Sequence, residues 1–364
     1  MIKALDIWLP AYLRQTRKTR KTKGIRHLLL CVCDHFEPFH HVKKEKAIAR
    51  VELWGDEFPK LTKPFLDSGG GAPKHTFFYP IEQYDEDILT PLAQLCRATG
   101  CEVEFHLHHN HDTAANLRVT LDRGKQDLLR HGLLSRDEKG QTRYGFIHGN
   151  WALDNSHPRG EHCGVRNELQ VLNETGCYAD FTMPSAPGRT QTQTINSLYY
   201  ARGTNEPKSH DRNIIPAEVG KKPSGDLLLV QGPLGLNWNK RKLGCLPGIE
   251  NGDLTGKNPP TLERLRLWLD LNIHVKGRPE WLFVKLHTHG AIPPNSSLFL
   301  GAQMQQFHRD LAAFAADNTG FRYHYVTARE MVNILHAAED GHQGDPDEFR
   351  DYRYQSLISK DRRE

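Results

Sequence analysis

Histidines gather at one point of the sequence in a spacing that suits a metal ion. The chain holds 21 histidines in 364 residues, and His106, His108, His109 and His111 fall within six positions. His106 and His108 are two residues apart, so on a strand their side chains would point to the same face. Four imidazoles would be costly to desolvate together unless a cation shared them. Since neutral imidazole suits Zn²⁺ and its transition-metal neighbours, the segment predicts a metal site.

Three further segments share this design, an apolar run that ends in histidine or aspartate. They are Leu28–Cys33 before Asp34 and His35, Tyr144–Ile147 before His148, Asn150, Trp151 and Asp154, and Trp281–Leu286 before His287 and His289. Ligands and catalytic groups collect at the carboxyl ends of parallel strands. We therefore expect these side chains to lie near the histidine group at one edge of a sheet.

Short apolar runs alternate with longer helical patterns from residue 26 onward. The expected strands are His27–Cys33, His75–Tyr79, Cys101–His108, Tyr144–His148, Ala179–Thr182, Leu227–Gln231, Trp281–His287 and Tyr323–Val326. The expected helices are Lys43–Phe58, Asp85–Thr99, Asn110–His131, Arg166–Thr175, Thr261–Val275, Gly301–Asp317 and Ala328–Ala338, the last opened by a capping box at Thr327 and Glu330. This alternation favours a parallel sheet, open or closed into a barrel.

Composition and missing motifs exclude several classes of protein. The formal net charge is only +4, which does not suggest a nucleic-acid binder. The apolar run Leu28–Cys33 is six residues long, whereas a membrane-spanning helix needs about twenty. Seven cysteines without a C-x-x-C pair, and no secretory signal, predict reduced thiols in a cytoplasmic protein. The sequence has no G-x-G-x-x-G after a strand, no Walker A motif and no G-x-S-x-G elbow.

The chain divides into a lead-in, a main domain and a tail. Residues 1–25 combine an amphipathic pattern with a basic run, which fits a capping helix or a helix lying on anionic lipid at the inner membrane face. Residues 26–340 form the expected catalytic domain, in which 185–225 and 245–260 are expected to be long surface loops. Residues 341–364 are polar and charge-rich, which predicts a flexible tail.

Over roughly residues 26–340 the chain resembles the NodB-like polysaccharide deacetylases of the glycoside hydrolase/deacetylase superfamily. The resemblance is carried by the apolar strand ending in Asp34 and His35, by His106, and by Val-Lys-Leu-His287. It implies an α/β fold, a distorted (β/α)7-type barrel. It also implies that Asp34 is the catalytic base, that His35 and His106 are metal ligands, and that His287 is the catalytic acid.

The sequence departs from the family pattern at three places. His35 replaces the second acid of the family, so Asp34 is either the base or a metal ligand. The residue four after His106 is Asn110, so the second metal histidine is either His108 or His111. The family's arginine-containing third motif is not evident, and His148, Asn150, Trp151 and Asp154 occupy that region.

The resemblance implies a hydrolase that removes N- or O-linked acetyl groups from a glycan, with a divalent metal ion, Zn²⁺ being favoured. The expected sugar contacts are His148, Asn150, Trp151, Asp154 and His289. One alternative is a glycoside hydrolase, which needs two carboxylates about 5–5.5 or 6.5–9.5 Å apart. Asp34, Glu37, Asp112 and Asp154 are its candidates. The other alternative is a catalytically silent barrel that binds a glycan or a membrane-associated complex.

Overall fold

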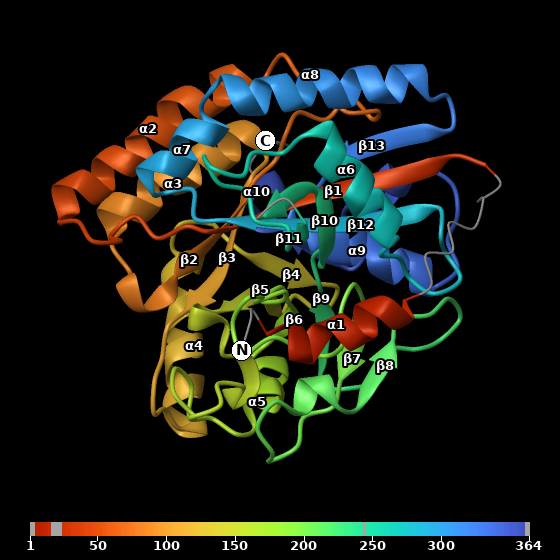
Figure 1. Ribbon diagram of the computed structural model, residues 1–364. Coiled ribbons are helices and arrows are strands. Elements are labelled where there is room, and N and C mark those ends of the chain that lie inside the picture. The colour runs from red at the N-terminus through yellow and green to blue at the C-terminus, as the bar shows by residue number, and fades with distance from the viewer. Residues whose placement is uncertain (1–3, 16–23, 243–244, 361–364) are drawn as a thin grey trace.

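The apolar runs of the sequence become the strands of one mostly parallel sheet (Figure 1). The computed structural model describes residues 4–15, 24–242 and 245–360. Seven strands follow one another in parallel, in the order β12 (Trp281–Thr288), β1 (Arg26–His35), β2 (Thr76–Pro80), β3 (Glu102–Leu107), β5 (Thr142–His148), β6 (Cys177–Asp180) and β9 (Leu227–Val230). β13 (Phe321–Tyr325) pairs in parallel with the first half of β1. All eight strands expected from the sequence are therefore confirmed.

Both faces of this sheet are covered, which explains the continuous apolar runs. On β1, Leu28 and Leu30 join the core beneath the surrounding helices, whereas Leu29, Cys31 and Cys33 join a second core around α9. The helices are α2 (Lys44–Thr62), α3 (Glu86–Thr99), α4 (Ala114–Leu129), α5 (Glu168–Glu174), α6 (Leu262–Leu271), α7 (Pro293–Phe299), α8 (Ala302–Asp317) and α9 (Ala328–Glu339). The capping box at the start of α9 is confirmed, and every residue of that helix is buried.

Two segments expected to be loops contain additional strands. β7 (Leu198–Ala201) and β8 (Ile214–Pro216) extend the sheet beyond β9 as antiparallel strands. In the second segment, β11 (Leu246–Glu250) forms a separate hairpin with β10 (Gly235–Lys242), which precedes that segment. Some of the glycines and prolines that predicted loops lie within the strands themselves, such as Pro216 in β8 and Pro247 and Gly248 in β11, so the composition concealed these strands.

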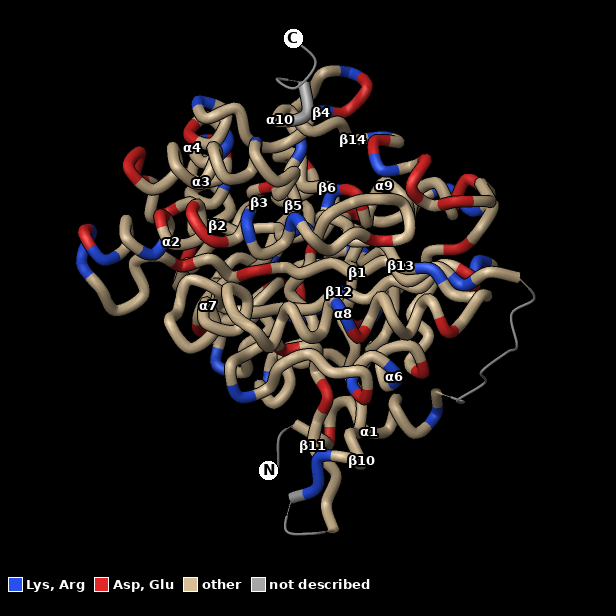
Figure 2. Tube along the Cα trace, turned by 90° about the horizontal axis from the view of Figure 1, so that it is seen from above, with Lys and Arg blue, Asp and Glu red and all other residues tan. Residues whose placement is uncertain are grey.

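The C-terminal segment also differs from the expected flexible tail. Within it lie η5 (Pro346–Phe349), β14 (Tyr354–Ser356), which pairs with β4 (Ser135–Asp137), and α10 (Leu357–Lys360). Its charged residues pair with the body of the protein, because Arg350 contacts Glu330 at 2.9 Å and Asp351 contacts Arg329 at 2.6 Å. Residues 361–364 lie outside the described part. Figure 2 shows both signs of charge interspersed around the outside of the molecule.

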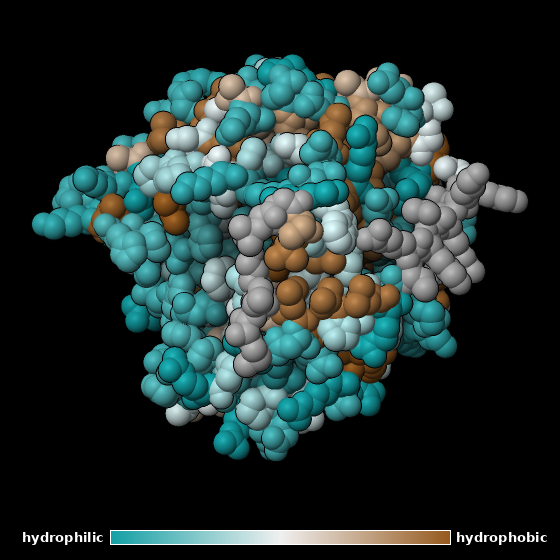
Figure 3. Space-filling view, viewed as in Figure 1, coloured by the Kyte–Doolittle hydropathy of each residue, from teal (hydrophilic) through white to brown (hydrophobic). Residues whose placement is uncertain are grey.

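The lead-in forms α1 (Leu5–Arg14), and this helix packs against the protein. Trp8 is fully buried and clusters with Ala186, Ile195 and Leu234, as the capping-helix interpretation expects. Hydrophobic residues show at the surface over α1 in Figure 3. Most of the basic run, residues 16–23, lies outside the described residues. No described helix is long and apolar enough to cross a membrane.

Replacing Trp8 with alanine is expected to weaken the docking of α1 by about 3–5 kcal/mol, because a fully buried tryptophan would leave a cavity. Native-state hydrogen exchange of the α1 amides measures this change. Leu13→Ala is the control: its side chain belongs to the same helix but is 71% exposed, so its effect should stay below about 0.5 kcal/mol. Equal protection of α1 in both variants would contradict the capping role.

Candidate metal centre

The carboxyl ends of β1, β3 and β12 bring the predicted histidines together. β1 pairs directly with β12, where Cys33 lies opposite His287, and His35 is the last residue of β1. The ring of His35 lies 4.9 Å from that of His106, 4.7 Å from that of His289 and 6.2 Å from that of His287, measured between centroids. Residues as far apart in the sequence as His35 and His289 therefore form one imidazole group.

Glu37 lies at the centre of this group, although sequence reasoning did not assign it as a ligand. Its Oε1 is 3.2 Å from Nε2 of His108 and 3.9 Å from Nε2 of His106, and its Oε2 is 2.9 Å from Nδ1 of His289. The ligand atoms of Glu37, His106 and His108 all lie within 4.8 Å of one another. Its position two residues after His35 gave only a weak signal, because β1 ends at His35 and strand alternation does not fix the direction of Glu37.

Both histidines of this triad are fixed through their outer ring nitrogen. Nδ1 of His106 donates to the carbonyl of Ile147 at 2.9 Å, and Nδ1 of His108 bonds to Glu82 at 2.8 Å. Metal-binding histidines are oriented in this way, with the second nitrogen left for the ion. Nε2 of His106 is buried and has no hydrogen-bond partner among the described residues. The donor set therefore fits a divalent transition metal.

The electrostatics of the triad are strongly coupled. Burial opposes the ionisation of Glu37, but hydrogen bonds from His108 and His289 hold its pKa far below the usual range. Burial also lowers the pKa of His108, yet the two carboxylates beside it, Glu37 and Glu82, raise it to about 9. Burial and the neighbouring His108 lower the pKa of His106 to about 3. The Glu37 carboxylate therefore favours a positive charge next to it, whereas His106 stays neutral and keeps a lone pair for a metal ion.

Two further imidazoles, His35 and His287, lie buried beside the triad. Nε2 of His35 and Nδ1 of His287 have no hydrogen-bond partner in the described part of the chain. Burial lowers the pKa of both rings well below the usual value. Both rings are therefore neutral, and a neutral imidazole can accept a proton or bind a metal ion.

Trp151 covers this group from the loop after β5. Its ring lies 5.6 Å from that of His35 and 6.0 Å from that of His289. Asn150, Trp151, Asp154 and Asn155 all adopt positive φ, between 52° and 55°. Non-glycine residues in this conformation carry strain and cluster at functional sites. The loop is therefore held in an unfavourable backbone conformation with Trp151 against the histidines.

Asp34 does not reach the metal centre. Its Oδ2 bonds to Nε2 of His75 at 2.8 Å, and its Oδ1 accepts from the amide of Gly290 at 2.6 Å. His75 in turn packs among Trp54, Phe77 and Phe299, in the layer between sheet and helices. Neighbouring residues of a strand point to opposite faces, so a strand that directs His35 inward directs Asp34 outward.

Of the two alternatives for the second metal histidine, the structure brings His108 to the centre, whereas His111 is exposed. His289 lies at the centre through Glu37, and Asn150 is exposed beside Trp151. Asp154 is held by Ser209 and His210. His148 belongs to a different side-chain group, with Glu168 and His109.

No protein-family model matches the chain, and the comparison with curated proteins also finds no match.

Proposed function

We propose that the chain is a metal-dependent hydrolase that removes acetyl groups from a glycan. The observation that carries the proposal is the convergence of Glu37, His106 and His108, with both histidines oriented by outer hydrogen bonds. Two histidines and one glutamate form a three-ligand set of the kind that catalytic zinc sites use, with a fourth position left for water or substrate. When bound, such an ion lowers the pKa of a coordinated water toward about 7 and polarises the acyl carbonyl.

The surrounding side chains supply proton transfer and orientation. His289 donates to Oε2 of Glu37 at 2.9 Å and thereby fixes the direction of that carboxylate. His35, with its unpartnered Nε2 beside the triad, accepts the proton of the attacking water in this proposal, in place of Asp34. The proton that His35 takes from the water then passes by way of the neighbouring His287 to the departing amine, so both imidazoles are neutral again at the end of the cycle. An amine is a poor leaving group and needs such an acid.

Trp151 and the resemblance to deacetylases support a glycan substrate. Trp151 is half-buried and presents an aromatic ring at the entrance of the group, where a pyranose could stack. His108 and His289 retain side-chain exposures of 31% and 29%, so the centre is open to solvent on this side. We further propose that the seven parallel strands form the distorted (β/α)7-type barrel of that superfamily.

The glycosidase alternative is less well supported, because three of its four candidate carboxylates bind elsewhere. Asp34 bonds to His75, Asp112 to His109, and Asp154 to Ser209. Glu37 alone among the four lies at the imidazole group.

Acetate release from N-acetylated glucosamine oligomers tests the proposal. Purified protein should release acetate, lose that activity on chelation, and regain it with about one equivalent of Zn²⁺ per site. The expected product keeps its chain length and gains one free amine per acetate. Shortened oligomers without acetate would favour the glycosidase, and activity that survives complete metal removal would reject the proposal.

A further inference from the structure

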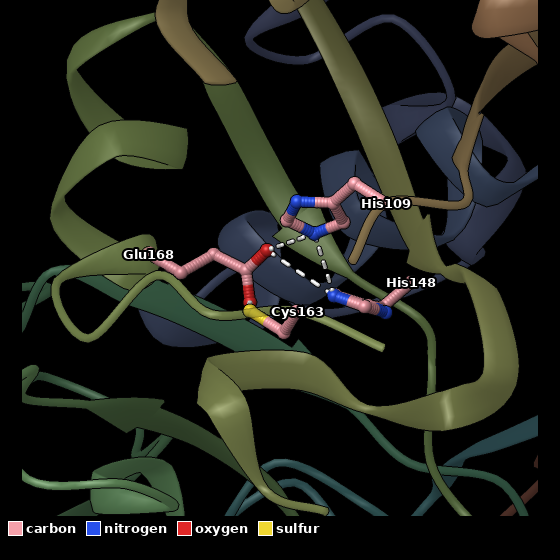
Figure 4. Close-up of side chains that lie close together, drawn as sticks. All are labelled: His109, His148, Cys163 and Glu168. Carbon is pink, nitrogen blue, oxygen red and sulfur yellow. Dashed lines mark hydrogen bonds and ion pairs between the residues drawn. The ribbon is translucent and has the colours of Figure 1, made fainter. Parts of the chain in front are cut away.

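A second group of ligand-type side chains lies behind the first and takes no part in the proposed reaction. It consists of His109, His148, Cys163 and Glu168 (Figure 4). His109 follows β3, His148 is the last residue of β5, Cys163 lies in the loop between β5 and α5, and Glu168 is the first residue of α5. One ligand atom from each lies within 4.8 Å of all the others, and three of the four residues are fully buried.

The rings of His109 and His148 face each other through their Nε2 atoms. In the neutral form of each ring, Nε2 carries no proton. Nδ1 of His148 donates to the carbonyl of Gly149 at 2.6 Å, and Nδ1 of His109 donates to Asp112 at 3.0 Å. Each ring therefore carries a lone pair on Nε2, yet these two atoms are only 2.8 Å apart. Two lone pairs at this distance repel, and a shared cation removes the repulsion.

Glu168 places a carboxylate at the same point, where no described lysine or arginine contacts it. Its Oε1 is 3.0 Å from Nε2 of His109 and 3.3 Å from Nε2 of His148. Its Oε2 accepts from the amide of Asp154 at 2.6 Å. Among the described residues, its basic partners are histidines only. A fully buried carboxylate is costly unless a cation compensates it.

Cys163 completes the group and distinguishes a metal from a proton. Its thiol donates a hydrogen bond to Oε2 of Glu168 at 3.6 Å, and its Sγ accepts one from the amide of Val165 at 3.4 Å. A proton on His109 would also separate the two lone pairs, but it would not use the sulfur. Burial raises the pKa of the Cys163 thiol, so without an ion the sulfur keeps its proton and gives it to Glu168. A metal ion bound within the group would replace that proton and take the sulfur as a thiolate ligand.

The loop that carries Cys163 is fitted closely to the end of β3. The amide of Asp112 donates to the carbonyl of Cys163 at 2.8 Å. Gly164 has φ +99°, and a Cβ on it would lie 2.6 Å from the amide nitrogen of Asp112. Only glycine fits this approach, so the backbone holds Cys163 in place whether or not an ion is bound.

We propose that His109, His148, Cys163 and Glu168 form a second metal site, which binds Zn²⁺ as a structural ion. Four protein ligands of nitrogen, sulfur and oxygen type close the coordination sphere, which is the mark of a structural site. The ligands of a tetrahedral zinc lie roughly 3.3–3.8 Å apart, so small side-chain shifts bring this group to that geometry.

The position of the second site assigns its role. His109 follows His108 of the first centre, and His148 follows Ile147, whose carbonyl orients His106. The site also joins both ends of the loop between β5 and α5, which carries Trp151 at positive φ. A metal here fixes that strained loop, and with it Trp151, against the first centre.

Cobalt substitution tests the second site independently of the proposed reaction. Thiolate bound to Co²⁺ gives a charge-transfer band in the near ultraviolet, and the first centre has no cysteine. The wild-type chain loaded with Co²⁺ should show this band, and metal analysis after zinc loading should give two equivalents. His106→Ala should lose one equivalent and keep the band, whereas Cys163→Ala should lose the other equivalent and the band.

Cys96→Ala and Cys245→Ala are the matched controls, one buried in the core and one exposed, and both should keep the band. Asp112→Asn should weaken binding about 10–100-fold, since Asp112 orients His109. Wild-type protein without a thiolate band after Co²⁺ loading, or a band that persists in Cys163→Ala, would overturn the second site. Neither result would bear on the first centre, which acetate release tests separately.

Discussion

His106→Ala is expected to lower kcat/KM for acetate release by roughly 10³-fold or more, a loss of about 4 kcal/mol of transition-state stabilisation. Nε2 of His106 is buried, has no partner in the described structure, and faces Oε1 of Glu37. The substitution removes one of the three proposed ligands. It also leaves the carbonyl of Ile147 without its donor, which costs about 1–3 kcal/mol of stability. The variant should therefore stay folded and lose one equivalent of metal.

The matched control is His131→Ala, because His131 is a half-buried histidine that contacts Tyr84 far from the centre. Circular dichroism, metal content and steady-state kinetics should be measured on both variants. His131→Ala should retain the metal and the activity. If His106→Ala kept its full complement of metal with an unchanged kcat, Glu37 and the two histidines would not be the catalytic centre.

The long strands and their burial on both faces could be predicted from the sequence, because a parallel strand covered on both faces needs a continuous apolar run. Leu28–Cys33 and Trp281–Leu286 are such runs, and the residues that follow them meet at one edge of the sheet. The short strands β7 and β8 could not be predicted from the sequence, since they are four and three residues long and lie among glycines and prolines.

The sequence predicted site residues only where the alternation of one strand sets the directions of the side chains. His106 and His108 were found because their spacing alone places them on one face. Asp34 was assigned through the family pattern, although strand alternation already directs it away from His35. Glu37 was missed as a ligand because it lies beyond the end of β1, where the direction of a side chain depends on the neighbouring loops.

The second group lay beyond sequence reasoning for a different reason. Cys163 and Glu168 are more than fifty residues from His109, and no metal-binding spacing connects them. The loop that brings them back depends on Gly164 and on the pairing between Cys163 and Asp112. Such contacts exist only in the folded chain, so the sequence singled out His109 and His148 for other roles and did not connect them with Cys163 and Glu168.

Glu168→Ala is expected to lower the free energy of unfolding by about 3–5 kcal/mol, the usual result of removing one member of a buried charged group. The substitution would leave the amide of Asp154 without its acceptor and the rings of His109 and His148 without their carboxylate. Urea unfolding of the zinc-loaded protein measures the loss. The loop that carries Trp151 should also loosen, which predicts a higher KM for the acetylated oligomer together with a lower kcat.

Glu174→Ala provides the control on the same helix, because Glu174 is exposed at the end of α5 and pairs with Arg118 at the surface. An exposed ion pair contributes little, so this variant should lose less than about 1 kcal/mol. Similar unfolding curves for the two variants would show that the buried carboxylate of Glu168 contributes no more to stability than the exposed one of Glu174. The stability difference between the wild type and Glu168→Ala should be measured with and without zinc. A difference that is large in the zinc-loaded proteins and smaller in the zinc-free proteins would show that Glu168 stabilises the fold through the bound ion.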